Sequence, residues 1–439
     1  MCKSFLISKL RVSKIENISN LCFTLHMHIE KEKMSKITDK TELFSKELFD
    51  SFSKSRCTVL YGLRRSGKTF FLKNSFAPLC KNVYGCPALF MDLEEISRLG
   101  VHSDSDLIDF FNSKLGDFKF VIFDEVSLLE NFPFFYRFIK KKEGIHFLFS
   151  SSVAIDYLDA LKEKKDVDLS FFYFGASRFK DFSEGFERYL RFGFLPSLKD
   201  TSNEAKSIFY LERLLDQILL PEIAFQDGLR SPFLLKRILV LLGENLSTLL
   251  NSKILSGLYL QKYAHSVDPK TIEKYLLSLE KHFLVQKVTR RELKEGETLG
   301  ALYKYYFRDE GIRNAARGFE NAHLSGSFEE LTALLLSSYG FSIENGFFYS
   351  FYTNEKGKRA RKAQYIDFVL SEEKKQILVQ VVERKTPKDK IDKKKEALRR
   401  VAYKAAKFMV YEDDVPSTMD EYGIRSSSLV DFLNVLKTL

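Results

Sequence analysis

Short apolar runs alternate with amphipathic stretches over the first third of the chain. Four runs have the length and composition of buried strands: Cys57–Tyr61, Ala88–Leu93, Phe118–Glu125 and Ile145–Phe149. Residues 41–54, before the first run, space their apolar positions as an amphipathic helix does. Strands that alternate with helices of these lengths predict a doubly wound parallel sheet of the α/β class.

The pattern becomes largely helical between about residues 170 and 245, where leucines line the apolar faces. It then predicts two further helices, Ile254–Tyr263 and Thr271–His282. Two strand-like runs follow, Phe283–Thr289 and Tyr303–Phe307. Two helices followed by a hairpin predict a winged helix, and the rest of the chain returns to a mixture of helices and strands.

The loop after the first apolar run carries the clearest chemical signal. Eight residues fit the pattern G-x-x-x-x-G-K-[ST] without a mismatch: Gly62, Leu63, Arg64, Arg65, Ser66, Gly67, Lys68 and Thr69. A strand precedes them and an apolar helix follows, so backbone N–H groups and the helix dipole converge on a bound phosphate. Lys68 is expected to reach the β- and γ-phosphates of ATP, and Thr69 to ligate Mg²⁺.

A later apolar run ends in two carboxylates, Asp124 and Glu125. Because ligands bind at the carboxyl ends of strands in a parallel sheet, Asp124 is expected to face the phosphate loop and to contribute to Mg²⁺ binding. A lone Asp124 would instead indicate a helix N-cap or a solvated strand end, and its pairing with the loop favours the metal role. Glu125 is placed to polarise an attacking water and is the expected catalytic residue.

The next strand ends in three serines, Ser150, Ser151 and Ser152. Ser151 and Ser152 are candidates to sense the γ-phosphate by hydrogen-bonding the attacking water, although serine at a strand end also serves as a cap or turn residue. An extra strand and helix separate the phosphate loop from the Asp124-Glu125 strand. That order is typical of ATPases in which an additional strand lies between those two in the sheet.

These patterns divide the chain into five expected parts. They are an N-terminal extension (1–40), a P-loop ATPase core (41–165), a helical lid (166–248), a winged-helix domain (249–320) and a C-terminal α/β domain (321–439). Met34 is an alternative start residue, which would make the preceding segment dispensable.

Composition adds little to this picture. Hydrophobic residues make up 45% of the chain, enough to bury several ordinary cores. No apolar run reaches the length of a membrane span. Five cysteines, which contain no C-x-x-C pair, predict reduced thiols in a cytoplasmic protein: Cys2, Cys22, Cys57, Cys80 and Cys86.

The charge of the chain leads to the hypothesis that the protein binds nucleic acid. The formal net charge of +10 is compatible with such a partner without requiring one. Glu383–Lys407 holds 11 basic and 4 acidic residues, and a second basic run contains Lys356, Lys358, Arg359, Arg361 and Lys362. Phosphates could also contact four residues of the predicted winged helix: Lys270, Lys274, Arg290 and Arg291. The alternatives are solvated charged faces and a winged helix that serves packing or protein contacts.

Taken together, these residues resemble the prokaryotic AAA-type ATPases that join an ATPase core to a C-terminal domain of uncharacterised function. The matching pieces are the phosphate loop, the Asp124-Glu125 strand, the three serines, the winged-helix segment, Tyr189–Pro196 and Tyr305–Arg313. The resemblance extends from about residue 40 to the C-terminus. It implies that ATP drives a change of conformation and that the C-terminal domain has a restriction-endonuclease-like fold.

That fold implies a metal-dependent nuclease site, from which this chain departs. Glu329 and Asp367 match the acids of the helix and the first strand. Gln380 and Val382 stand where a Glu and a Lys would gather Mg²⁺ and a water at the phosphodiester. The nearby Glu383–Lys385 could replace them only after a register shift that would turn the side chains to the wrong face. The sequence therefore predicts a degenerate nuclease-like site.

Two further departures concern turnover. Phe149-Ser150 replaces the Thr-Gly that the family tends to place before its paired serines, and Lys162–Ser170 contains no clear match to an arginine finger. ATP binding is therefore better supported than hydrolysis. The leading hypothesis is an AAA-type ATPase, and the alternatives are a nucleic-acid-binding protein with a regulatory or vestigial ATPase and, less favoured, a metal-dependent nuclease. The sequence leaves the partner and the oligomeric state open.

Overall fold

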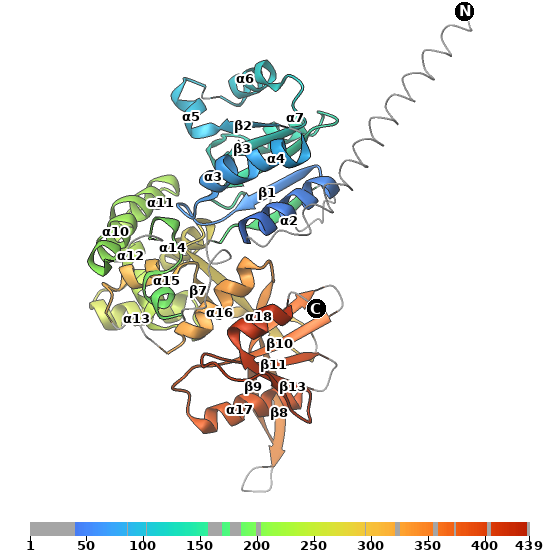
Figure 1. Ribbon diagram of the computed structural model, residues 1–439. Coiled ribbons are helices and arrows are strands. Elements are labelled where there is room, and N and C mark those ends of the chain that lie inside the picture. Colours follow the sequence, from blue (N-terminus) through green and yellow to red (C-terminus); the bar gives the residue numbers. More distant parts are fainter. Residues whose placement is uncertain are drawn as a thin grey trace, which may run out of the picture. The chain divides into compact units, whose positions relative to one another are not determined.

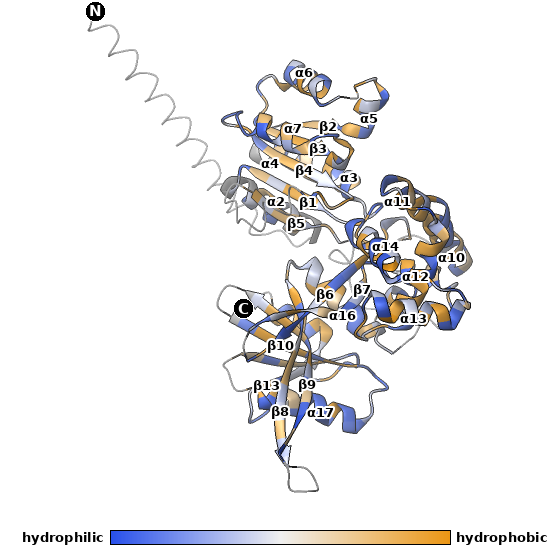
Figure 2. Cartoon of the chain, turned by 180° about the vertical axis from the view of Figure 1, so that it is seen from behind, coloured by the Kyte–Doolittle hydropathy of each residue, from blue (hydrophilic) through white to orange (hydrophobic). Residues whose placement is uncertain are grey.

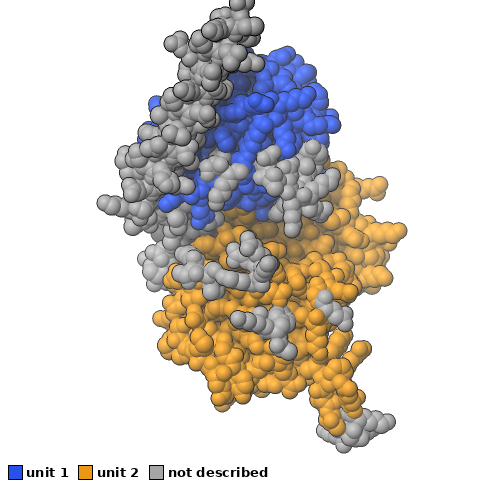
Figure 3. All heavy atoms as spheres, turned by 90° about the vertical axis from the view of Figure 1, so that its right-hand side faces the viewer, with its two compact units in different colours: residues 1–61, 67–172 blue, residues 62–66, 173–439 orange. Residues whose placement is uncertain are grey.

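The computed structural model describes residues 40–85, 87–101, 103–156, 169–175, 186–198, 203–294, 296–320, 325–353, 359–372, 375–401 and 405–436. Met34, Cys2, Cys22, Cys86, Lys356, Lys358 and most of Lys162–Ser170 lie outside these ranges. The chain forms two compact units, coloured separately in Figure 3. The first contains residues up to Tyr61 and Gly67–Phe172, and the second contains Gly62–Ser66 and everything from Tyr173 onward.

The first unit is built on a sheet (Figure 1). Its described strands follow the order β2-β3-β4-β1-β5 and are all labelled in Figure 2. The strands are β1 (Cys57–Tyr61), β2 (Ala88–Asp92), β3 (Phe120–Asp124), β4 (His146–Ser151) and β5 (Leu169–Tyr173). The pairs β1–β4, β3–β4 and β2–β3 are parallel. The predicted parallel α/β sheet is therefore confirmed, with β4 as the additional strand between β1 and β3.

Helices cover both faces of this sheet. They are α2 (Lys40–Lys54), α3 (Lys68–Phe71), the π-helical segment η1 (Leu72–Phe76), α4 (Ala77–Tyr84), α5 (Leu93–Arg98), α6 (Asp104–Leu115), the 3₁₀ turn η2 (Val126–Leu128) and α7 (Phe132–Ile139). On one face, the Phe123 ring of β3 packs 5.0 Å from that of Phe135 and 5.5 Å from that of Phe111. On the other face, Phe120 packs 5.5 Å from Phe49 of α2. Burial on both faces explains why these strands are continuous apolar runs in the sequence.

The second unit begins with a helical region. Its elements are α9 (Glu187–Phe192), the 3₁₀ turn η4 (Pro196–Leu198), α10 (Glu204–Arg213), the π-helical segment η5 (Leu214–Leu219), α11 (Leu220–Gln226), α12 (Pro232–Glu244), α13 (Ser252–Tyr263), α14 (Pro269–Lys281) and α15 (Glu310–Ala316). Their leucine-rich faces form one core, in which Leu211, Leu215 and Leu239 are fully buried.

An extended sheet forms the rest of the second unit, with described strands in the order β12-β13-β11-β10-β9-β8-β6-β7. The elements are β6 (Val285–Glu292), β7 (Thr298–Phe307), α16 (Ser327–Ser338), β8 (Ile343–Thr353), β9 (Arg359–Glu372), β10 (Lys375–Val382), α17 (Lys388–Arg400), β11 (Ala406–Tyr411), β12 (Thr418–Met419), β13 (Ile424–Ser428) and α18 (Leu429–Leu436).

The hairpin of the predicted winged helix belongs to this larger sheet. β6 and β7 pair in antiparallel fashion, and β6 also pairs in parallel with β8, opposing Arg290 to Asn345. The two preceding helices, α13 and α14, are present, with the Asp268 carboxylate accepting from the Lys270 N–H at 2.8 Å. The winged-helix and nuclease-like assignments stay predictions.

Candidate nucleotide-binding site

The phosphate loop turns sharply from β1 into α3. Arg65 and Gly67 both have left-handed backbone angles, with φ of 69° and 97°. The Ser66 N–H donates to the Leu63 carbonyl at 3.2 Å, closing the turn. Because Gly67 has no side chain to cap the helix, the N–H groups that open the helix at Lys68 remain oriented for an anion.

A close backbone contact requires glycine, rather than a residue with a side chain, at the start of the loop. A β-carbon on Gly62 would lie 2.5 Å from the carbonyl oxygen of Phe174, well inside van der Waals contact. Alanine at this position would therefore displace the loop from the segment that follows β5.

The side chains in the middle of the loop have different surroundings. Leu63 and Ser66 are buried, while Arg65 is exposed. The Arg64 guanidinium pairs with the Glu222 carboxylate at 3.0 Å. The Ser66 hydroxyl has no hydrogen-bond partner despite being buried. An unsatisfied buried hydroxyl in such a loop fits a binding site for an anionic ligand.

Lys68 connects the loop to the end of β4. Its ammonium group is almost fully buried and donates to the Ser152 hydroxyl at 3.1 Å. Ser152 comes directly after β4, and the preceding Ser151 pairs with Tyr61, the last residue of β1. Parallel pairing of β1 and β4 thus explains why the loop lysine meets this serine.

Asp124 ends β3 and is 3% exposed. Its carboxylate accepts hydrogen bonds from the hydroxyls of Ser150 and Thr69. Burial raises the pKa of Asp124, and the two hydrogen bonds only partly oppose this shift. A nearby divalent cation would favour the ionised form. The Thr69 hydroxyl and the Asp124 carboxylate are oxygen ligands of the kind that Mg²⁺ prefers, so this pair fits magnesium.

Glu125 follows β3 with a left-handed φ of 59°, and its N–H donates to the Ser150 hydroxyl at 3.0 Å. Its carboxylate accepts from the Ser152 N–H at 2.8 Å, from the Ser152 hydroxyl at 2.6 Å and from the Ser127 hydroxyl. Burial by itself would raise the pKa of Glu125, but the Lys68 charge and these hydrogen bonds reverse the shift. The pKa is therefore lower than usual, and the carboxylate stays ionised at neutral pH.

The three serines have distinct partners. Ser150 bonds Asp124 and the Glu125 backbone, while Ser152 bonds Lys68 and the Glu125 side chain. The Ser151 hydroxyl instead donates to the Val153 carbonyl at 2.5 Å. Of the two sensor candidates, Ser152 is therefore the one that contacts the other predicted site residues. Sequence reasoning assigned no role to Ser150, whose position after an apolar strand was the only available signal.

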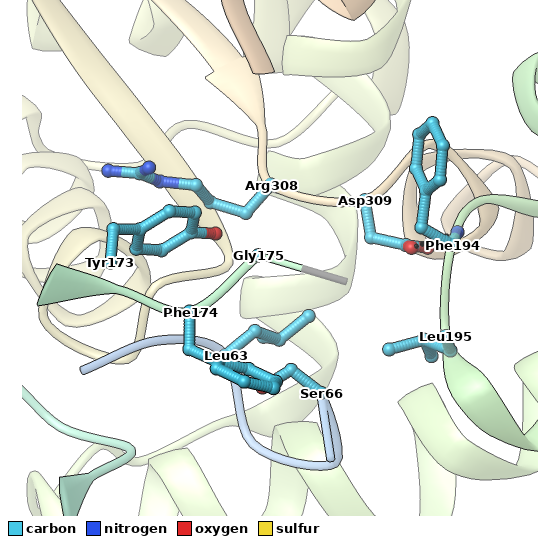
Figure 4. Close-up of a pocket in the computed structure, with 9 residues that line it drawn as sticks. All are labelled: Leu63, Ser66, Tyr173, Phe174, Gly175, Phe194, Leu195, Arg308 and Asp309. Atoms are coloured by element: carbon cyan, nitrogen blue, oxygen red, sulfur yellow. Dashed lines mark hydrogen bonds between the residues drawn. The ribbon is translucent and has the colours of Figure 1, made fainter. Parts of the chain in front are cut away.

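A small cavity within the second unit adjoins the first half of the phosphate loop (Figure 4). Its lining combines apolar, aromatic and polar residues: Leu63, Ser66, Tyr173, Phe174, Gly175, Phe194, Leu195, Arg308 and Asp309. The Arg308 guanidinium lies 4.3 Å from the centre of the Tyr173 ring.

The segments Tyr189–Pro196 and Tyr305–Arg313, which carried part of the family resemblance, pack against each other. The Asp309 carboxylate accepts from the N–H groups of Phe194 at 2.7 Å and Ile312 at 3.1 Å. Burial raises the pKa of Asp309 to about 6, partly opposed by these bonds. A β-carbon on Gly193 would lie 2.2 Å from the Asp309 carboxylate, which explains the glycine. These residues fix the fold around the cavity.

The predicted nuclease-like residues Glu329 and Asp367 lie near one another, bridged by a lysine. The Lys304 ammonium is 2.8 Å from the Glu329 carboxylate and 4.0 Å from that of Asp367. Lys394 of α17 pairs with the second oxygen of Asp367. Burial would raise the pKa of Asp367, but Lys394 and Lys304 lower it below its usual value.

These contacts do not fit an additional metal. Lys304 and Lys394 already pair with the two carboxylates, so neither carboxylate could bind a divalent cation without giving up an ion pair. Gln380 is buried and its amide donates to the Tyr365 carbonyl at 2.7 Å. Within the described part of the chain, no group of three or more His, Cys, Asp or Glu residues could hold a metal ion.

The basic residues of the predicted winged helix are in part engaged within the protein. Arg291 pairs with Glu344 at 2.9 Å, and the Arg290 guanidinium lies 4.5 Å from the centre of the Phe347 ring. Lys274 donates to the Gly228 carbonyl at 3.4 Å, and Lys270 is exposed. Two of the four candidates for phosphate contact thus have protein partners along the sheet.

Two further sequence expectations concern cysteines and membranes. Cys57 and Cys80 are buried. Among the described helices, none is long and apolar enough to cross a membrane. The cytoplasmic location stays a prediction.

Comparison with known proteins gives distant relatives. An uncharacterised protein of Haemophilus influenzae is 24% identical over 333 residues, which cover 71% of this chain and 82% of that protein. A Walker-type ATPase of Pyrococcus abyssi matches 64% of this chain and 97% of its own length, with 15% identity and a TM-score of 0.43. The ORC1 protein of Aeropyrum pernix, solved in complex with DNA, matches 63% of this chain and 91% of its own length, with 13% identity and a TM-score of 0.26. At these TM-scores the structural likeness carries no functional argument.

Family models match two segments of the chain. Residues 183–323 match a domain of unknown function, DUF8612. Residues 54–168 match an AAA domain, and this segment contains the phosphate loop, Asp124, Glu125 and the three serines. The match agrees with the parallel sheet and its strand order. The chain therefore contains a nucleotide-binding P-loop domain of the AAA type.

Proposed function

We propose that this protein is an ATPase that binds ATP with Mg²⁺ at the phosphate loop and hydrolyses it to drive a change of conformation. The observation that carries the proposal is a series of hydrogen bonds from Lys68 to Ser152 and from Ser152 to Glu125. It connects a cation suited to the β- and γ-phosphates with a carboxylate suited to polarise water.

The phosphate loop would hold the triphosphate through its backbone N–H groups and Lys68. The unpartnered Ser66 hydroxyl supports a ligand at this position. Thr69 and Asp124 would hold Mg²⁺, which when bound offsets the negative charge of the phosphates.

Hydrolysis would require the Glu125 carboxylate to give up one of the hydrogen bonds that it now accepts and to accept one from the attacking water instead. Ser152 is the donor best placed to be exchanged, because its hydroxyl contacts both Lys68 and Glu125. Phosphates that attract the Lys68 ammonium would weaken its bond to Ser152. A shift of Ser152 would then free an oxygen of Glu125 to accept a hydrogen bond from water and to take its proton during attack.

Phosphate release by the Glu125→Gln variant tests this proposal. Glutamine preserves the size and most hydrogen bonds of the side chain but cannot take a proton. Loss of a general base typically slows a reaction by about 10²- to 10⁴-fold, and we expect a reduction in that range with ATP affinity retained. Glu130→Gln is a matched control, since Glu130 is exposed on the following loop. Equal rates in wild type and Glu125→Gln would overturn the role of Glu125.

A nuclease activity has less support. Lys304 and Lys394 neutralise Glu329 and Asp367, and Gln380 replaces a carboxylate ligand. Mg²⁺-dependent plasmid cleavage that disappears in Asp367→Ala would reverse this assessment.

A further inference from the structure

The two basic runs of the C-terminal region differ in what surrounds their charges. In α17, Lys393 pairs with Asp389 at 2.9 Å, and Arg400 pairs with Glu396 at 2.7 Å. Lys394, Lys395 and Arg399 also have carboxylate partners. Although Figure 2 shows α17 as a strongly hydrophilic helix, much of its positive charge is neutralised within the protein.

The run on the hairpin of β8 and β9 has a different environment. Between Asn345 and Ile366 the sequence contains five basic residues and one acidic residue, Glu355, which lies outside the described ranges. Arg359, Arg361 and Lys362 are exposed, and no carboxylate of the described residues forms an ion pair with them. The charges of Arg359, Arg361 and Lys362 are therefore directed to solvent.

Strand pairing gathers aromatic and basic side chains on one face of the hairpin. Phe351 lies opposite Arg361, and Phe347 lies opposite Tyr365. Because strand side chains alternate between faces, every second residue from these pairs shares the same side of the sheet. We define this aromatic–basic face by five residues: Tyr349, Phe351, Arg359, Arg361 and Tyr365.

The arginines of the aromatic–basic face lie against its rings. The Arg359 guanidinium is 4.2 Å from the centre of the Phe351 ring, and that of Arg361 is 4.6 Å from the centre of Tyr349. Tyr349, Phe351 and Tyr365 are nonetheless 38%, 51% and 46% exposed. A guanidinium that stacks through its face keeps its in-plane N–H groups free to donate to phosphate. The face therefore presents phosphate donors and exposed rings together.

We propose that the aromatic–basic face binds single-stranded nucleic acid. The arginines complement the phosphate backbone, and the exposed rings can stack on bases. In a duplex the base faces are hidden, so exposed rings favour an unpaired strand. Tyr349 and Phe351 are two residues apart on one strand, about 7 Å, or roughly twice the 3.4 Å spacing of stacked bases. A base can lie between these two rings when Arg361 leaves the Tyr349 ring for a phosphate, so base stacking replaces the present contact between Arg361 and Tyr349.

The aromatic–basic face shares no residue with the nucleotide site. Tyr349, Phe351 and the two arginines belong to the second unit, whereas Lys68 and Glu125 belong to the first. Lys68→Ala should therefore bind single strands as the wild type does when no nucleotide is present. That variant separates failure of this proposal from failure of the proposed ATPase.

Fluorescence anisotropy of labelled single strands, titrated with full-length protein at several salt concentrations, provides the test. Arg359→Ala/Arg361→Ala should weaken binding by about tenfold or more and make the salt dependence less steep, since each phosphate contact adds about 0.7 to the log–log slope for single strands. Lys393→Ala/Arg400→Ala is the matched control, because it removes the same charge from exposed residues that are already paired. It should bind nearly as the wild type does.

Ring stacking is tested at Phe351. Phe351→Leu should weaken binding by about fivefold or more, as loss of one base–aromatic stack does, while Phe351→Tyr should restore it. Because Phe351 is 51% exposed, both variants should retain the wild-type melting temperature.

DNA and RNA single strands of one sequence are compared with the corresponding duplex and with polyglutamate. Binding of either single strand that depends on Arg359, Arg361 and Phe351 supports the proposal. Four results would overturn it: no binding at low salt, equal loss in the two double variants, tighter binding of the duplex, or equal competition by polyglutamate.

Discussion

Both units of this protein bring lysine ammonium groups close to buried carboxylates, but they connect the two kinds of group differently. In the first unit, Lys68 donates to a serine hydroxyl at 3.1 Å, and that hydroxyl donates to Glu125 at 2.6 Å. In the second unit, Lys304 contacts Glu329 directly at 2.8 Å, and Lys394 contacts Asp367.

The difference distinguishes a site whose side chains can exchange hydrogen-bond partners from a cluster in which lysine and carboxylate are already paired directly. A direct buried ion pair is costly to break, because each charge would be left without compensation in a poorly polarisable environment. A hydroxyl that lies between cation and carboxylate can turn toward a phosphate or a water at smaller cost. Residue type alone therefore does not distinguish a ligand site from a structural cluster, whereas the pattern of pairing does.

The largest expected effect concerns the structural cluster. Lys304→Met should lower the free energy of unfolding by about 3–5 kcal/mol, because Glu329 loses its buried cation. Adding Glu329→Gln to Lys304→Met should recover part of that loss, since the uncompensated charge is removed. Urea denaturation measures both changes. If Lys304→Met were as stable as the wild type, the cluster would not have the structural role assigned to it.

Glu280, whose cation is farther away than that of Glu329, extends the comparison to a weakly paired carboxylate. Glu280 lies 3.8 Å from Lys287, and burial, only partly opposed by that charge, raises its pKa from 4.5 to about 7. Its contribution to stability is thus complete below pH 4.5 and is lost as the pH rises through about 7. The loss should amount to about 3 kcal/mol and should be absent in Glu280→Gln. Denaturation of both proteins across this range checks the prediction, and parallel pH profiles would contradict it.

The corresponding change in the first unit should affect ligand binding. Lys68→Ala should weaken ATP–Mg²⁺ binding by about 1.5–3 kcal/mol, because a charge-assisted contact to phosphate is lost. Titration calorimetry measures the affinity, with Lys81→Ala on the exposed side of α4 as the control. Lys304→Met should bind ATP like the wild type under conditions where it is folded. Similar losses of ATP affinity in Lys68→Ala and Lys304→Met would contradict the distinction between the nucleotide site and the structural cluster.

The smallest expected effect distinguishes the neighbouring serines. Ser152→Ala should slow phosphate release by up to about tenfold, since its hydroxyl contacts both Lys68 and Glu125. Ser151→Ala should have little effect, because the Ser151 hydroxyl donates to the nearby Val153 carbonyl. The reverse order of rates would indicate that Ser151 is the sensor.

Local patterns predicted much of the first unit. The apolar runs before Gly62 and up to Asp124 became β1 and β3, because strands buried on both faces need continuous apolar side chains. The bonds from Ser150 to Asp124 and from Ser152 to Glu125 were not predictable. They depend on β4 lying beside β3, a pairing that no local sequence pattern encodes.

Long-range contacts also limited prediction in the second unit. Glu329 and Asp367 were identified as a possible site. The lysines that neutralise them come from β7 and α17, and although Lys394 lies in the basic run that the sequence showed, nothing in that run indicates which carboxylate it meets. The basic run around Arg361 was visible in the sequence. Its alternation with aromatic rings became apparent only from the register of β8 and β9.

The nucleotide retained by the protein tests the central claim most directly. Wild-type protein and Glu125→Gln are incubated with Mg²⁺ and radiolabelled ATP, separated from free nucleotide, and the bound nucleotide is identified. We expect mainly ADP on the wild type and mainly ATP on Glu125→Gln, because both bind through Lys68 and only the wild type has a base. The same ratio of ATP to ADP on both proteins, or no retained nucleotide on either, would contradict the account.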